Sequence, residues 1–521
     1  MRTFLAFLLF IALILVSSCR KDFSTIPSFG NLEFSKDTVF LDTIFTNISS
    51  ATYNLKVYNR GNKAITIPRI SLENGISSNY RLNVDGIPGK EFVDIDILAK
   101  DSIYIFIETT IDASAVSNPL YTDRILFDNG NNQQDVDLVT LVQDAHFIYP
   151  GRNPFSMKID SLTIDGQPTT IKGRFLLDTE LTFTNTKPTV IYGYAAVPEN
   201  KTLTINAGAR VHFHSNSGLI IYKKAALKVN GNLNEKVVFE GDRLENSFSK
   251  IPGQWGTIWM RAGSKDNEIH HAQIKNGVIG ILIDSIGSNS SPTLQLSNTE
   301  IYNHSNFGIL ARETNIKAHN LVVGSAGQAS LAVTVGGTYN FTHCTFANFW
   351  NNGIRQLPAV LVNNFFVYEN ASGQEILETR DLRAANFTNC IFDGNNNIEF
   401  LLDKVDGSLF NYNIRNCMIS FTDTNKSFAG NAEMNFTDNP NYQNNVLNGL
   451  PDFRNTQNED FIIGENSGGI NKAMSSSFSF DILVMASANP NSKCCTELIT
   501  FSSVEAPIKF FNKLTFVNLS P

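Results

Sequence analysis

Charged residues are scarce in this chain, and their balance is acidic. They make up 17% of the 521 residues, and 41 Lys and Arg stand against 49 Asp and Glu, which gives a net charge of −8. A protein that neutralises phosphate groups needs a basic surface, so this balance argues against nucleic acid as a partner. Asn, Ser, Thr and Gly are abundant instead, which is typical of a surface built from strands and turns.

Long apolar runs are missing after the first 18 residues. Arg2 is followed by an apolar run over 4–16 and then by Ser17, Ser18 and Cys19. A basic start, an apolar run of about a dozen residues and small residues before a break describe a secretory signal that is too short to span a bilayer. We therefore expect residues 1–18 to be removed and the remainder to be extracytoplasmic and soluble.

The small-small-Cys sequence that ends this run resembles the cleavage box of bacterial lipoproteins. The resemblance implies that Cys19 becomes the lipidated first residue of the mature chain; an ordinary signal peptide cut near Ser18 is the alternative. The Lys21-Asp22 pair behind Cys19 resembles export tags of Bacteroidetes surface lipoproteins. It implies a lipid-anchored outer-membrane protein that faces the periplasm or the cell surface.

Cysteines are also few, and the other five form no disulfide framework. Cys344, Cys390 and Cys417 share one position of a repeat, and Cys494 and Cys495 are adjacent. Cys390 and Cys417 would lie about 4.8 Å apart on neighbouring strands, which permits a bridge. Buried free thiols that pack as small apolar residues are the favoured interpretation.

That repeat is an Asn or His that returns every two dozen residues or so in the second half of the chain. The repeat positions are His271, Asn298, Asn320, His343, Asn364, Asn389 and Asn416. Such a period with short β-rich units indicates a solenoid, because one unit is too small to bury a core alone. The residues one and three places after each position are mostly apolar and, by strand alternation, should point inward.

We call the seven Asn and His positions the ladder. The ladder side chains should lie where each turn bends and hydrogen-bond one another from turn to turn, since Asn suits left-handed turns and stacks on itself. A structural brace is favoured over an amide-lined binding stripe. Residues 368–383, between two ladder positions, are expected to form a projecting loop.

Short strands broken by Gly and Asn precede the ladder, as in 190–193, 203–209, 226–231 and 253–258. They resemble the first turns of right-handed parallel β-helix proteins, the pectate-lyase-like superfamily. The resemblance implies such a β-helix over 190–483.

The first half of the chain predicts a second β domain. Residues 53–58 and 102–107 alternate between polar and apolar, and about seven short strands indicate an antiparallel sandwich over 31–147. The order of strands and turns resembles immunoglobulin-like modules that precede β-solenoids in Bacteroidetes lipoproteins, which implies a spacer. The fold class is therefore all-β.

Three further segments complete the organisation. Residues 19–30 are expected to be a tether, and 148–189 a connecting segment. Residues 450–463 and 480–483 resemble the closing segment of such lipoproteins. Residues 484–521 depart from it and are either a diverged cap or the product of a frame change.

The sequence lacks the catalytic signatures of enzymes with this fold. There is no ladder of Asp for calcium, and residues 298–300 read Asn-Thr-Glu where the pectin hydrolases that the fold resembles use Asn-Thr-Asp. Neither Asp-Asp nor Gly-His-Gly occurs. Phosphate loops, zinc spacings and Ser/His/Asp patterns are equally missing, so we expect no cofactor and no metal.

The most reactive group of residues is His270, Lys275 and Arg261. A His or Lys base beside an Arg could neutralise and deprotonate a uronic acid. However, alternation gives His270 the same face as the inward Ala272, and a charged cluster without a pairing pattern is usually surface. We therefore expect no catalytic residue here.

Aromatic residues offer a second kind of site. Trp255 and Trp259, four residues apart in a strand, should share a face, and packing of the solenoid wall is favoured for both. Phe349 and Trp350 precede a turn and are the better candidates for an exposed ligand-binding platform.

These features favour a non-catalytic cell-envelope lipoprotein whose solenoid rod binds glycan or another envelope component. The alternative is a polysaccharide lyase or glycoside hydrolase that acts on acidic polysaccharide in a groove of the solenoid.

Overall fold

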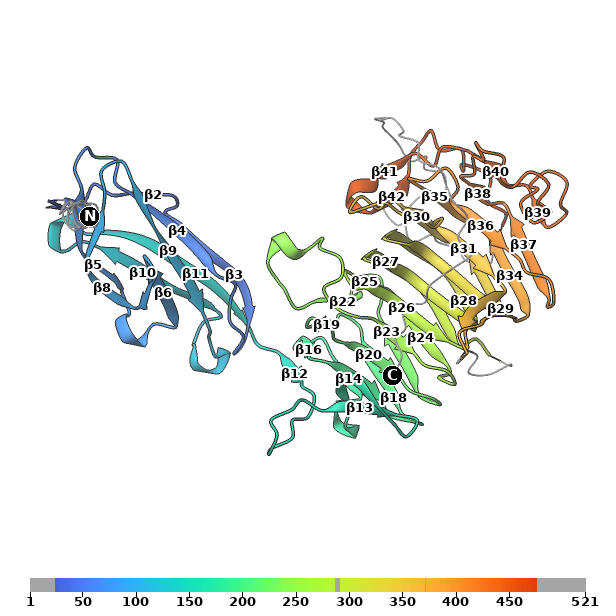
Figure 1. Ribbon diagram of the computed structural model, residues 1–521, viewed down its shortest axis with the longest axis horizontal. Coiled ribbons are helices and arrows are strands. Elements are labelled where there is room, and N and C mark those ends of the chain that lie inside the picture. The colour runs from blue at the N-terminus through green and yellow to red at the C-terminus, as the bar shows by residue number, and fades with distance from the viewer. Residues whose placement is uncertain (1–23, 286–290, 371, 476–521) are drawn as a thin grey trace, which may run out of the picture. The chain divides into compact units, whose positions relative to one another are not determined.

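The computed structural model describes residues 24–285, 291–370 and 372–475 (Figure 1). The predicted signal segment, Cys19, Cys494, Cys495 and the 484–521 tail lie outside the described residues. The chain divides into two compact units, Met1–Asp144 and Ala145–Pro521. The described residues of both units form β-structure with a few short 3-10 turns, and among them no helix has the length and apolar character needed to cross a membrane.

Unit 1 consists of two sheets that enclose one core. The first sheet contains β1 (Ile26–Pro27), β5 (Ile65–Leu72), β10 (Leu120–Phe127), β11 (Gln134–Gln143), β3 (Thr38–Phe45) and β8 (Glu91–Ile97). The second contains β2 (Glu33–Phe34), β4 (Tyr53–Tyr58), β9 (Ser102–Thr109), β6 (Tyr80–Val84) and β7 (Ile87–Gly89). Alternate residues of both sheets point into the core, among them Val39, Leu55, Val57, Ile105 and Ile125.

The predicted tether is partly a component of unit 1. Ile26 and Pro27 pair in parallel with Ile65 and Thr66. The Ser28 hydroxyl donates a hydrogen bond to Asp128. Proline is tolerated on this edge strand because an edge position does not require its missing N–H.

Unit 2 is built on a sheet of 27 strands arranged in three parallel columns, and each turn of the chain except the last supplies one strand, or part of one, to each column. Column A contains β14 (Gln167–Phe175), β17 (Tyr194–Val197), β20 (Gly218–Ile221), β23 (Ile258–Met260), β26 (Ile279–Asp284), β28 (Phe307–Ala326), β29 (Ala329–Thr342), β31 (Val360–Asn363) and β36 (Phe400–Asp403). Column B contains β15 (Thr182–Phe183), β18 (Thr202–Asn206), β21 (Ala226–Asn230), β24 (Asn267–His270), β27 (Leu294–His304), parts of β28 and β29, β34 (Leu382–Thr388), β37 (Phe410–Arg415) and β39 (Tyr442–Gln443).

Column C contains β12 (His146–Ile148), β16 (Thr189–Ile191), β19 (Arg210–Phe213), β22 (Val237–Gly241), β25 (Ala272–Lys275), parts of β27 and β28, β30 (Thr345–Asn348), β35 (Ile391–Gly394), β38 (Met418–Ile419) and β40 (Val446–Leu447). Only β13 (Ser161–Ile164) pairs antiparallel among the described strands of this sheet. Because β12 to β15 already belong to the sheet, the columns begin well before residue 190, inside the segment expected to be a connection.

The inward columns predicted from alternation are confirmed at six of seven turns. Ile274, Ile301, Val323, Phe346, Phe392 and Ile419 follow one another in register on column C and are fully buried. Cys344, Cys390 and Cys417 lie in the same core as buried free cysteines. One turn is too small to bury a core by itself, so the turns share a core built from these stacked apolar side chains.

The turn after Asn364 is the exception. Residues 365–379 leave the columns as a hairpin of β32 (Phe365–Glu369) and β33 (Glu375–Thr379). Strand β30 pairs directly with β35, so the ladder passes from His343 to Asn389. Asn364 is therefore not a ladder residue, and Phe365 and Val367 are half-buried in the hairpin rather than inward.

Candidate functional site

The remaining ladder residues occupy the bend between column B and column C. All six have a left-handed backbone: His271, Asn298, Asn320, His343, Asn389 and Asn416 have φ between 48° and 56°. The Asn298 amide donates to His271 Nε2 at 3.2 Å, and the Asn320 amide donates to Asn298 Oδ1 at 3.1 Å. Asn tolerates this backbone better than other residues with a Cβ, which explains its recurrence.

The last two ladder residues bind the main chain of residues 472–474. Asn389 exchanges two hydrogen bonds of 2.9 Å with the main chain of Met474, and Asn416 donates to the Lys472 carbonyl at 2.8 Å. Asn364, by contrast, donates to the Val405 carbonyl. Ladder amides thus brace turns at one end of the column and bind main chain at the other.

A second ladder lies at the bend after column C and was not predicted. Asn276 and Asn303 are buried, both have a left-handed backbone, and the Asn303 amide donates to Asn276 Oδ1 at 2.8 Å. Each comes five residues after a ladder position, as do Ser325 and Asn348. That constant offset is the signal in the sequence that could have identified it.

The structure does not bring His270, Lys275 and Arg261 together. They lie at the ends of strands in columns B, C and A, and each has its own acidic neighbour. His270 lies 3.6 Å from Glu268, Lys275 lies 2.9 Å from Glu240, and Arg261 lies 3.1 Å from Asp165.

His270 also points the opposite way from our expectation. Its side chain is 36% exposed on the outer face of column B, whereas Ile269 and Ala272 are buried. The left-handed backbone at His271 interrupts the alternation, so Ile269 before the bend and Ala272 after it both point inward. Simple alternation across residues 270–272 was therefore wrong.

Lys275 belongs to a row of polar side chains on the outer face of column C. Glu240, Lys275 and Tyr302 follow one another on β22, β25 and β27, and Gln273 and Glu300 form a parallel row. These polar side chains point outward because Phe239, Ile274 and Ile301 occupy the alternate, inward positions.

Two loops cover this row and leave a cavity of about 240 Å³. One loop contains η5 (Asn246–Phe248), and the other contains η6 (Thr456–Asn458), which precedes β42 (Asp460–Ile463). Lys250 from the first loop hydrogen-bonds Asn458 of the second. The lining residues are Ser249, Lys250, Gln273, Lys275, Asn276, Tyr302, Asn303, Asn458 and Glu459.

The two carboxylates nearest to Lys275 differ in their environment. Burial opposes ionisation of Glu240, but His212, Lys275 and Arg210 outweigh it and hold the pKa of Glu240 below its ordinary value. Burial raises the pKa of Glu459, against the opposing charges of Lys250 and Lys275. The pKa values of the two carboxylates are therefore shifted in opposite directions, down at Glu240 and up at Glu459.

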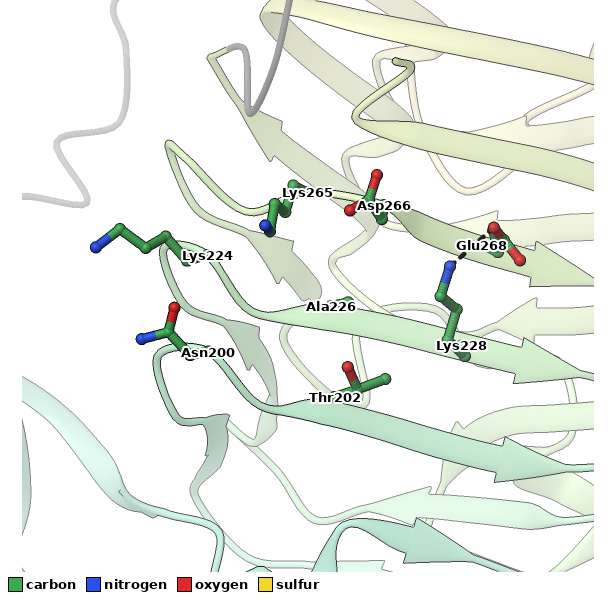
Figure 2. Close-up of a pocket in the computed structure, with 8 residues that line it drawn as sticks. All are labelled: Asn200, Thr202, Lys224, Ala226, Lys228, Lys265, Asp266 and Glu268. Carbon is green, nitrogen blue, oxygen red and sulfur yellow. Dashed lines mark ion pairs between the residues drawn. The ribbon is translucent and has the colours of Figure 1, made fainter. Parts of the chain in front are cut away.

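A larger hollow of about 450 Å³ opens on the outer face of column B (Figure 2). Its lining residues are Asn200, Thr202, Lys224, Ala226, Lys228, Lys265, Asp266 and Glu268. They come from three successive turns, and the small Ala226 lies between the longer side chains. Lys228 pairs with Glu268 at 2.8 Å and Lys224 pairs with Glu199 at 2.7 Å.

Lys265 differs from the other lysines of this hollow, because its ammonium makes no ion pair or hydrogen bond with any described residue. An anion that enters the hollow would meet this charge without having to displace a carboxylate. Hydroxyl and amide groups of Thr202 and Asn200 lie on the opposite side. The hollow thus offers the Lys265 cation and the neutral groups of Thr202 and Asn200, beside the carboxylate of Asp266.

The aromatic candidates are mostly packing residues. Trp255 is buried and stacks on Phe213 with ring centroids 4.4 Å apart. Trp259 is half-buried on the outer face of column A, where its indole donates to Asp284 at 2.6 Å, so the two Trp do not share a face.

The predicted platform of Phe349 and Trp350 is not openly displayed. The ring of Phe349 packs with Phe453 and Phe461, with centroids 6.1 Å away in both cases. Trp350 is half-buried at the next position. Among the residues that the structure describes, no group of three His, Cys, Asp or Glu is arranged to hold a metal ion.

No known protein family and no curated protein matches the chain. Among solved structures it is similar to a family 123 glycoside hydrolase from Clostridium perfringens, described in a study of glycolipid glycan hydrolysis. The identity is 12%, the match covers 22% of this chain and 27% of that chain, and the TM-score is 0.17. A likeness of that size carries no argument about fold or activity.

Proposed function

We propose that this protein is a non-catalytic cell-envelope lipoprotein, anchored to the outer membrane through Cys19, whose unit 2 is a right-handed parallel β-helix that binds glycan. The β-helix is supported by three parallel columns in register and by the stacked inward side chains. Unit 1, with two sheets around one core, is supported as an immunoglobulin-like domain.

The observation that carries the binding function is the Lys265 hollow on column B. It is open, polar and shared by three turns, and it presents an ammonium without an anionic partner among the described residues. Acidic sugars combine a carboxylate with hydroxyl groups, which matches one free cation beside Thr202 and Asn200. Non-catalytic binding is supported by the separation of His270, Lys275 and Arg261, each of which faces its own carboxylate.

Affinity electrophoresis of the mature protein in gels that contain polygalacturonate, alginate or hyaluronate tests this function. Lys265→Glu should weaken retardation by at least one of these polymers about tenfold, because it replaces the cation by a carboxylate that repels the acidic polymer. Lys317→Glu makes the same change at an exposed site elsewhere on column B and should have little effect. Equal retardation of both variants and the wild type would contradict the proposal.

The column C cavity supports a second candidate function, a polysaccharide lyase or glycoside hydrolase. A carboxyl group with a raised pKa can act as a general acid, and Glu459 lines the same cavity as Lys275 and Tyr302. Incubation with uronic-acid polysaccharides would then produce unsaturated ends or new reducing sugar. Glu459→Gln should abolish this product, whereas Glu369→Gln on the exposed hairpin should not.

A further inference from the structure

The outer face of the second sheet of unit 1 gathers aromatic side chains that the core does not use. Leu55 and Val57 on β4 and Ile105 on β9 point inward and are fully buried. Alternation therefore turns their neighbours outward, and Tyr104 and Phe106 are 47% and 43% exposed. Two large rings on adjacent outward positions form an exposed apolar surface in a place where polar residues are expected.

The rings and one lysine form a continuous patch, which we call the Tyr104 face: Tyr58, Tyr104, Phe106 and Lys56. Tyr104 and Phe106 have nearly parallel rings, at 15°, with centroids 6.1 Å apart. Lys56 lies directly across from Tyr104 in the sheet register. Its ammonium lies 5.1 Å from the Tyr104 centroid and 5.2 Å from the Tyr58 centroid.

Two arginines near the Tyr104 face are paired with carboxylates, whereas the lysine at its centre is not. Arg60, which stacks over Tyr58, forms an ion pair with Glu33 at 3.0 Å, and Arg81 lies 3.6 Å from Glu108. Lys56 makes no ion pair with any residue that the structure describes. An anion that binds here could pair with the Lys56 ammonium without breaking an existing ion pair.

A hydrogen-bonding group without a partner lies in the same register. Asn83 on β6 is directly across from Phe106, and its Oδ1 is buried without a hydrogen-bond donor among the described residues. A buried acceptor left unpaired is unfavourable, so Asn83 would gain a hydrogen bond if its side chain rotated to bring Oδ1 to a ligand hydroxyl.

Contacts between lysine and aromatic rings stabilise a sheet by themselves, which accounts for Lys56 beside Tyr58. They do not account for two adjacent rings that remain more than two-fifths exposed, or for the unpaired Asn83 oxygen. A pyranose ring has an apolar face that packs on an aromatic ring and hydroxyl groups at its rim. A carboxylate on that sugar would supply the anion that Lys56 lacks.

We propose that the Tyr104 face of unit 1 is a binding site for acidic, carboxylate-bearing glycan. The sugar packs on Tyr104 and Phe106, its carboxylate pairs with Lys56, and a hydroxyl donates to Asn83. This site is separate from the Lys265 hollow of unit 2 and does not rest on glycan binding there. It gives unit 1 a recognition role in addition to that of a spacer.

A local readout tests the site independently of unit 2. Reductive methylation of the mature protein, followed by peptide mass spectrometry, measures the reactivity of Lys56 with and without polygalacturonate, alginate or hyaluronate. At least one of these polymers should lower the methylation rate of Lys56 at least fivefold, and its carboxyl-reduced form should not. Unchanged reactivity with all three, or equal protection by the carboxyl-reduced polymer, would overturn the proposal.

Variants of the full chain provide the second arm. Both variants are made in a Lys265→Glu background. Tyr104→Leu should remove the protection of Lys56 from methylation while the sheet keeps an apolar side chain. Lys56→Gln should weaken binding of the protecting polymer at least tenfold. Phe40→Ala is the matched control, because Phe40 is 51% exposed on the other sheet of unit 1. Protection that survives Tyr104→Leu, or that is lost equally in Phe40→Ala, would contradict the site.

Discussion

Lys275 and Glu240 form an ion pair of 2.9 Å across neighbouring strands of column C, where only 26% and 13% of their side chains are exposed. The pair directs the amine of Lys275 to a carboxylate whose pKa is held low. This ion pair gives Lys275 a structural role, because its side chain is directed to Glu240. The candidate base with the best access to a cavity is thus already engaged.

Replacement of Lys275 tests that role. Lys275→Ala should lower the free energy of unfolding by about 1–3 kcal/mol, because Glu240 stays largely buried with one cation fewer. Denaturant unfolding of the two proteins gives this difference. Lys317→Ala, at an exposed site, should change stability by less than about 0.5 kcal/mol. A cleavage activity that disappears in folded Lys275→Ala would instead favour the enzyme.

The ladder makes its own prediction at Asn389. Asn389→Ala should cost about 1–3 kcal/mol, because it removes the bonds to His343 and to Met474. Asn389→Gly removes the same amide but relaxes the left-handed backbone, so it separates hydrogen bonding from strain. Asn395→Ala is an exposed comparison. Equal and negligible shifts in melting temperature would contradict a bracing role.

His304 should make stability depend on pH. Burial lowers its pKa from 6.5 to about 4. Below pH 6.5 the imidazole becomes protonated in the unfolded chain but stays neutral in the folded protein. The free energy of unfolding should therefore fall by roughly 3 kcal/mol between pH 6.5 and 4. Below pH 4 this residue should contribute little further change. Comparison of the pH dependence of unfolding for the wild type and His304→Gln isolates this contribution.

His214 provides a control of opposite sign. A hydrogen bond to Asp242 raises the pKa of His214, so its contribution is present below pH 6.5 and is lost as pH rises through the folded pKa. His214→Gln should therefore reduce stability mainly on the acidic side. A variant of His304 with an unchanged pH profile would show that the imidazole is not held neutral.

Arg355, in the loop that follows β30, forms a buried ion pair with Glu399, which directly precedes β36, and 2% and 0% of their side chains are exposed. Glu399 also accepts the amides of Ala359 and Asn396. Glu399→Ala should therefore cost about 3–5 kcal/mol, because it leaves a buried guanidinium without its anion. The double variant with Arg355→Met should recover part of that loss, which denaturant unfolding can measure.

The proposed lipid anchor makes a prediction at Cys19. Cys19→Ala should convert the protein from a detergent-phase to an aqueous-phase protein in a phase-partition assay, because acyl chains contribute roughly 0.8 kcal/mol per buried methylene. A Ser18→Gly variant keeps the small residue before the Cys and should still be anchored. Continued partition of Cys19→Ala into detergent would exclude lipid attachment at this residue.

Some properties of this protein follow from the sequence by itself. The period of the ladder and the alternation after each bend predict which residues are inward, because both depend on spacing within one short strand. Ile274, Ile301 and Phe346 are examples. Asn or His at each left-handed bend is local in the same sense, since the backbone at that residue selects it.

Other properties are decided only by the tertiary structure. The outward position of His270 results from the bend at His271, and the displacement of Asn364 results from a hairpin that leaves the columns. Glu459 lines the same cavity as Lys275 although it lies in a loop 184 residues (459 − 275) farther along the chain. Spacing along a strand carries no information about such a contact, because the path of a covering loop depends on packing between distant turns.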